Sequence, residues 1–156
     1  MTDLTDSVKE RLKYYLEEAV DDIYVSTNWN IDLVYSKSYP AATVKLEPII
    51  WREVVYGKKV PEDGAMVEIH FSIWVADEED RSYLDEHPYR YSVMDIADEI
   101  CDYLITISGN QTERTSYNIH RIYDITVDSG GSKKTGRPRA INIMIIKGKI
   151  WAKWLD

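Results

Sequence analysis

Three side chains in the sequence could together do acid–base or metal chemistry. Glu68 and His70 stand two residues apart in a segment of alternating hydrophobicity, and His120 stands in a later segment of the same kind. If these segments are neighbouring strands, a carboxylate and two imidazoles would meet on one sheet face and could bind a divalent cation or transfer a proton. Histidine on a half-exposed sheet face is also commonly only hydrogen-bonded. We therefore favour a structural role and keep a small metal-dependent hydrolase as the alternative.

Other signatures of enzyme chemistry are missing from the sequence. It contains no G-x-S-x-G, H-E-x-x-H, G-x-G-x-x-G or C-x-x-C motif. Cys101 is the only cysteine, which excludes an internal disulfide and the cysteine-rich zinc patterns. It lies on or beside an apolar helical stripe, flanked by Asp98, Glu99 and Asp102, and such surroundings raise the pKa of a thiol. We expect no enzyme activity, no catalytic residue, no metal site and no cofactor.

The element that carries Glu68 and His70 is segment 65–76, AMVEIHFSIWVA. Every odd position from 67 to 75 is apolar, whereas Glu68 and His70 occupy even positions. Because successive side chains of a strand point to opposite faces, this segment is predicted to be a strand with one face on a core. Trp74 falls on the polar side, which indicates that the second face is partly covered, either by the chain itself or by a partner.

The other elements follow from the spacing of apolar residues and from turn signals. Recurrences of three and four predict amphipathic helices, and alternation predicts strands. The helices are expected at 4–23 and 91–107, and the strands at about 43–56, 65–76, 117–127 and 140–155. A chain of 156 residues, 44% of them hydrophobic, can bury one core of ordinary size. We predict one α+β domain over 1–156, with a mostly antiparallel β-sheet and both helices packed on one face.

The charges are divided unevenly along the chain. The formal net charge is −8, yet residues 129–156 contain seven Lys or Arg and one Asp, so that this part carries +6 and the remainder −14. A basic and an acidic region allow copies of one protein to attract each other head to tail. A solvated C-terminal hairpin explains the same distribution. The glycine-rich stretch 128–139, DSGGSKKTGRPR, is predicted to be a mobile basic loop.

Aromatic residues exceed what a core of this size requires. The chain contains five Trp and twelve Tyr, and such rings are enriched at protein interfaces. For Trp29 and Tyr35 in the segment WNIDLVY, we favour core packing over docking onto a neighbouring subunit. The candidate residues for a subunit or partner interface are Trp29, Tyr35, Glu68, His70, Trp74, Lys133, Lys134, Arg137, Arg139, Trp151 and Trp154.

The N-terminal stretch is charged and contains no apolar run of signal-peptide or membrane-span length. We expect a soluble protein that is intracellular when made and has no membrane partner.

The order of the expected elements resembles that of the tail terminator and tail completion proteins of long-tailed phages and viruses. The segments that carry the resemblance are LTDSVKERLKYYLEEAVDDI, AMVEIHFSIWVAD, YSVMDIADEICDYL and INIMIIKGKIWAKWLD. The resemblance rests on arrangement and covers nearly the whole chain. Head-completion and neck connector proteins have a similar size and a similar arrangement of elements, and they are the alternative.

The resemblance implies a structural virion protein. Its subunits would form a hexameric ring that caps the tail tube and joins it to the neck. Its partners would be further copies of the chain, the tail tube protein and a neck or connector protein, and DNA would pass through the ring without sequence-specific binding. The implied location is the tail–neck junction of the virion, after assembly in the host cytoplasm.

Overall fold

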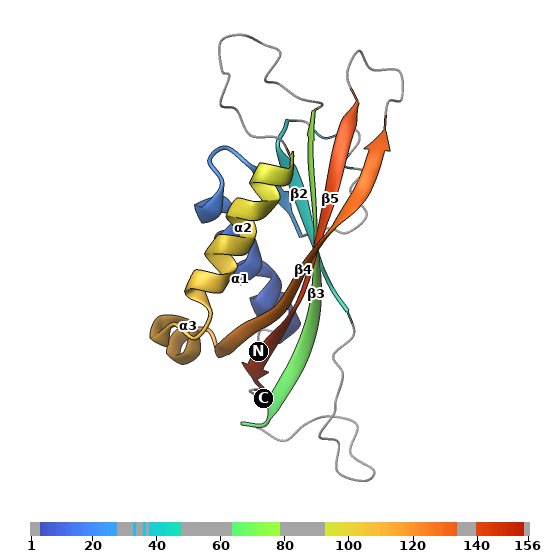
Figure 1. Cartoon of the computed structure of the whole chain (residues 1–156). Coiled ribbons are helices and arrows are strands. Elements are labelled where there is room, and N and C mark those ends of the chain that lie inside the picture. The colour runs from blue at the N-terminus through green and yellow to red at the C-terminus, as the bar shows by residue number, and fades with distance from the viewer. Residues whose placement is uncertain are drawn as a thin grey trace.

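The computed structural model describes residues 4–27, 33, 36, 38–47, 64–78, 93–133 and 140–154. Across these residues, helices cover one face of a five-stranded sheet (Figure 1). One pair of neighbouring strands is parallel and the other three pairs are antiparallel. The predicted α+β class, with a mostly antiparallel sheet and helices on one face, is confirmed.

The sheet has the spatial order β1-β2-β3-β5-β4. The strands are β1 (Tyr24–Ser26), β2 (Ala41–Leu46), β3 (Met66–Glu78), β4 (Ile119–Lys133) and β5 (Ile141–Lys153). β3 lies in the middle and pairs with β5 over thirteen residue pairs without a register shift. The predicted strand 65–76 is therefore confirmed, and it is the centre of the sheet.

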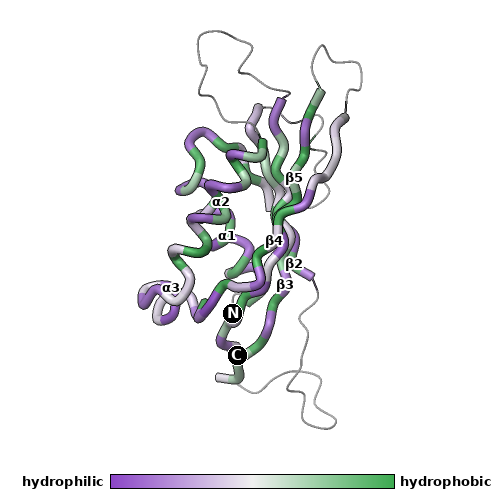
Figure 2. Tube along the Cα trace, viewed as in Figure 1, coloured by the Kyte–Doolittle hydropathy of each residue, from purple (hydrophilic) through white to green (hydrophobic). Residues whose placement is uncertain are grey.

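The two faces of β3 have different neighbours. Its odd positions from 67 to 75 are buried in the main core together with side chains of both long helices. At one end of the opposite face, Trp74 packs in a second cluster that contains Leu33 and Tyr39. These two residues belong to the segment between β1 and β2, so the chain itself covers this end of the second face. Figure 2 shows hydrophobic stretches along α2 and the strands beside it.

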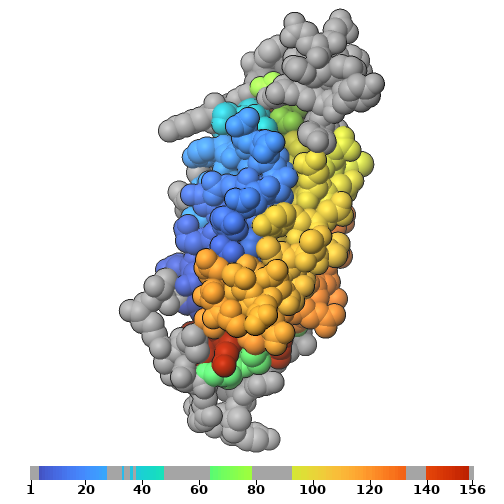
Figure 3. Space-filling model, turned by 90° about the vertical axis from the view of Figure 1, so that its left-hand side faces the viewer, coloured from blue at the N-terminus to red at the C-terminus, as the bar shows by residue number. Residues whose placement is uncertain are grey.

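The helix layer consists of α1 (Leu4–Ala19), α2 (Val93–Ile107) and the short α3 (Gln111–Ser116). In Figure 3 the three helices lie side by side over one face of the molecule. The predicted helix 4–23 is too long, since α1 ends at Ala19 and Asp22 has a φ of 60°. Val20 and Ile23 are nevertheless buried, because the turn after α1 keeps both in the core.

Two strand predictions need correction. The strand predicted at 43–56 starts two residues earlier and β2 ends at Leu46, while residues 48–63 lie outside the described part of the chain. The strand predicted at 117–127 continues to Lys133, so the mobile loop predicted at 128–139 is wrong for 128–133. That stretch has a loop-like composition but pairs through its backbone with β5, from Asp128 opposite Ile145 to Lys133 opposite Ile141.

A buried ion pair holds α3 against α1. Arg11 donates two hydrogen bonds to Glu113, from Nε to Oε1 at 2.6 Å and from Nη2 to Oε2 at 2.7 Å. The Tyr15 hydroxyl also donates to Oε1. The Arg11 guanidinium lies 4.2 Å from the ring centroid of Tyr14 and 3.7 Å from that of Tyr117. The charge of Arg11 is thus neutralised in the plane of the guanidinium and packed against two aromatic rings.

We expect Glu113→Gln to lower the free energy of unfolding at neutral pH by roughly 2–4 kcal/mol, because it leaves the largely buried Arg11 without a counter-charge. Burial alone would raise the pKa of Glu113, but hydrogen bonds from Arg11 and Tyr15 outweigh burial and hold that pKa below its ordinary value. The pair therefore stabilises the fold fully above the unfolded-state pKa, and this contribution is lost as the pH falls through the folded-state pKa.

Denaturant unfolding of both proteins between pH 7 and the acid limit measures this effect. The difference in the free energy of unfolding between the native protein and Glu113→Gln should become smaller below about pH 4. Glu17→Gln, at an exposed position of α1, is the control and should change little. A difference that stays constant down to the acid limit would contradict the ion-pair account.

Gly148 on β5 makes room for the ring of Phe71. The two residues face each other across β3 and β5, and a Cβ atom at position 148 would lie 2.5 Å from Cζ of that ring. We expect Gly148→Ala to lower the free energy of unfolding by about 1–3 kcal/mol through overpacking. In a Phe71→Leu background, Gly148→Ala should lower the free energy of unfolding clearly less. Equal costs in both backgrounds, measured by denaturant unfolding, would show that the ring is not the obstacle.

Candidate functional site

The face of the sheet that lies opposite α1 and α2, which we call the open face, carries a row of lysines. On β5 the even positions Ile146, Gly148 and Ile150 are buried, and the two isoleucines pack in the main core. Because side chains alternate along a strand, the odd positions point to the open face. These are Lys147, Lys149, Trp151 and Lys153, which we call the β5 row.

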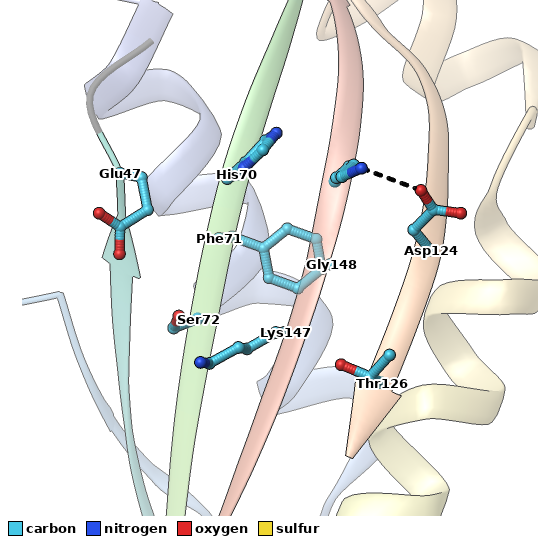
Figure 4. A pocket seen from close by; sticks show the side chains of 9 residues that line it. Glu47, His70, Phe71, Ser72, Asp124, Thr126, Lys147 and Gly148 are labelled. Carbon is cyan, nitrogen blue, oxygen red and sulfur yellow. Dashed lines mark ion pairs between the residues drawn. The ribbon is translucent and has the colours of Figure 1, made fainter. Parts of the chain in front are cut away.

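A hollow of about 470 Å³ lies in the open face (Figure 4). Its lining comes from β3, β4 and β5 and from the residue after β2, and comprises Glu47, His70, Phe71, Ser72, Asp124, Thr126, Lys147, Gly148 and Lys149. A β-bulge shapes one side of it. Between Tyr123 and Thr126, two residues of β4 stand opposite Gly148 alone, and Asp124 has a φ of 52°. The bulge turns Asp124 toward the lysines of β5.

Two ion pairs neutralise most of the charge in the hollow. Asp124 Oδ2 lies 3.1 Å from Lys149 Nζ, and Glu47 Oε1 lies 3.9 Å from Lys45 Nζ. Both pairs are partly exposed, so each contributes little to stability. Lys147 is exposed and has no ion pair with any residue that the structure describes. The hollow therefore presents one lysine whose charge is available to a binding partner.

Next to the hollow, Glu68 is a buried carboxylate on the open face. It is only 7% exposed, and the Tyr123 hydroxyl donates to its Oε1 at 2.7 Å. Its Oε2 lies 2.9 Å from His70 Nε2. Tyr123 reaches Glu68 from β4, across the intervening β5. The sequence could not indicate this partner, because the contact depends on the register of two strand pairs.

The predicted cluster of Glu68, His70 and His120 forms only in part. Glu68 and His70 meet, but His120 lies beside Arg114 and Lys153 instead. Burial and these two cations lower the pKa of His120. Among the described residues, no group of three or more His, Cys, Asp or Glu side chains could hold a metal ion. The hydrolase alternative thus lacks the three-residue site on which it was based.

The other candidate interface residues fall into three groups. Trp74 packs in the second cluster, and Trp154 packs against the main core. Trp151 belongs to the β5 row on the open face. Lys133 ends β4. Trp29, Tyr35, Lys134, Arg137 and Arg139 lie outside the described residues. A role of any of these residues in an interface stays a prediction.

Cys101 has the properties expected of a buried, unreactive thiol. It faces the main core on α2, and burial raises its pKa to about 11, with further contributions from Asp98 and Asp102. The predicted direction of its pKa shift is confirmed.

No helix in the described ranges is long and apolar enough to cross a membrane.

Comparison with known proteins gives little to add to this geometry. No protein-family model matches the chain, and no curated protein matches it in sequence. Among solved structures, a likeness is found to a chain described as the PVC sheath/tube terminator, in its extended state, of an extracellular contractile injection system. The identity is 12% and the TM-score 0.42, and the match covers 100% of this chain but 58% of that one. At these values the likeness supports no inference about function.

A thiol with a pKa of about 11 should react slowly with iodoacetamide, since only the thiolate attacks. At neutral pH we expect the folded chain to react roughly 100-fold more slowly than the chain in denaturing guanidinium chloride, because about two pKa units separate the two thiolate fractions. Mass spectrometry of the alkylated protein measures both rates. Similar rates in the two states would contradict the assignment of Cys101 as a buried thiol.

Proposed function

We propose that this protein is a structural subunit of the tail terminator or tail completion type, which assembles with further copies into a ring that caps a tail tube and joins it to the neck. The observation that carries the proposal is the open face. In the part of the chain that the structure describes, the helices cover only the other face of the sheet, and this face offers a hollow and an exposed lysine with which another protein could form complementary contacts.

The reactive groups of the described residues favour a structural role over catalysis. Glu68 is held by Tyr123 and His70, and Glu113 is held by Arg11 and Tyr15. The thiol of Cys101 has a raised pKa. A nucleophile or general base needs an accessible position and a pKa near the working pH, and these groups lack one or both.

The layered architecture suits a ring. A closed ring uses heterologous contacts, in which one surface of a subunit binds a different surface of the next. Here the helix layer and the open face lie on opposite sides of the same sheet and differ in chemistry. The excess of acidic residues in the chain, with a net charge of −8, also suits a channel through which DNA passes without being bound. We propose six subunits and a location at the tail–neck junction, by the resemblance in element order.

The proposal predicts a change of mass on assembly. The purified chain, alone or added to purified tail tubes, should form particles of about six times 18.2 kDa or bind at tube ends. Mass photometry measures the first result and electron microscopy of labelled protein the second. A chain that stays monomeric at high concentration and also fails to bind tube ends would contradict the proposal.

A further inference from the structure

The β5 row and helix α2 have opposite charge and lie on opposite sides of the domain. β5 contains Lys147, Lys149 and Lys153 and no acidic residue. α2 contains four acidic residues and no Lys or Arg: Asp95, Asp98, Glu99 and Asp102. These four are exposed or half-exposed, and α2 itself lies at the surface of the molecule beside α1 (Figure 3).

We propose that α2 of one copy docks its acidic outer surface on the β5 row of the next copy. The proposal rests on the ring function proposed above and names the two surfaces that form its repeating contact. Both surfaces belong to the same chain, so every copy offers one of each, and the contact can repeat from subunit to subunit until a ring closes.

The spacing of the charges on the two surfaces agrees. Four residues of an α-helix rise about 6 Å, the separation along the axis between Asp98 and Asp102. Two residues of a strand rise about 6.8 Å, the separation between Lys147 and Lys149. One carboxylate of the helix can therefore lie opposite Lys147 while a second reaches Lys149, which is also paired with Asp124 of its own chain.

The acidic groups of the open face do not cancel this attraction. Glu47 and Asp124 lie at the hollow and are paired with Lys45 and Lys149 of their own chain, so Asp124 neutralises one of the three lysines of the β5 row. Glu68 is buried, and its carboxylate is hydrogen-bonded to Tyr123 and His70. The remaining cations on this face include Lys147 and Lys153, and neither forms an ion pair with a residue that the structure describes.

Exposed apolar side chains flank the acidic surface of α2. Met94 is 57% exposed and Ile105 is 62% exposed. Their positions differ by eleven, which is slightly more than three full helical turns, so both lie on the same side of the helix as Asp98 and Asp102. Docking of this side would remove both from water and add hydrophobic stabilisation to the charge pairing.

Charge reversal on each surface tests the contact. Lys147→Glu gives a sheet surface that repels the native α2, and Asp102→Lys gives a helix that repels the native β5 row. Both positions are exposed, so folding should be unaffected. Under the conditions in which the native chain assembles, alone or on purified tail tubes, each variant by itself should need on the order of 10-fold more protein to assemble, or more.

A 1:1 mixture of the two variants should restore assembly. In an alternating ring, the new carboxylate at position 147 of one variant would face the new ammonium group at position 102 of the other, and the second contact would retain its native Lys147 and Asp102. Glu17→Lys, an exposed charge reversal on α1, is the matched control and should assemble as the native chain does. Raising the salt concentration should weaken the native and the mixed assemblies alike, because exposed charges are screened.

The outcomes separate this inference from the proposed function. If the native chain forms rings and either single variant forms them equally well, or if the mixture stays dispersed, the α2–β5 contact is wrong and the ring function stands. If the native chain assembles neither alone nor on tubes, both fail. Assembly of each variant only in the mixture would establish the contact.

Discussion

The pairing of β3 with β5 is the constraint on which the rest of the structure depends. Thirteen residue pairs are in register, and side chains alternate on both strands. A slip of one residue would move Lys147 and Lys149 into the main core and Ile146 and Ile150 into water, so the burial of one face fixes the register of both. The same alternation that gives the helices an apolar surface to cover also gathers the lysines of β5 on the open face.

Local departures from regular structure adapt this sheet to its neighbours. The bulge at Asp124 turns a carboxylate toward β5 and forms one wall of the hollow. Gly148 stands opposite the bulge on one side and next to the Phe71 ring on the other. The Arg11–Glu113 pair joins α1 to α3, the short helix that leads into β4. The domain that results has a helix layer on one side, the open face on the other, and different chemistry on each.

Elements with strong periodicity could be predicted from the sequence. β3 and α2 follow the expected spacing of apolar residues almost to the residue, and Glu68 and His70 meet because neighbours two apart share a strand face. The prediction from composition was wrong where backbone hydrogen bonds determine the structure. Residues 128–133 are rich in Gly and Ser, yet they extend β4 because β5 offers them hydrogen-bonding partners.

The position of His120 and the partner Tyr123 could not be predicted for a related reason. Both lie on β4, whose register against β5 shifts at Ile119–Arg121 and again at Tyr123–Thr126. Local sequence does not indicate such shifts, so side chains of β4 cannot be assigned to their neighbours by counting residues. The turn after α1 is similar, since Val20 and Ile23 keep helical spacing although the helix has ended.

The central claim is that another copy of the chain covers the open face in the assembled protein. Lysine acetylation with a short pulse of reagent, followed by mass spectrometry, tests it directly on the assembled and the dissociated chain. The account predicts that Lys147 is strongly protected in the assembly, whereas Lys9 on α1 reacts equally in both states. Equal labelling of Lys147 in assembled and dissociated protein would contradict it.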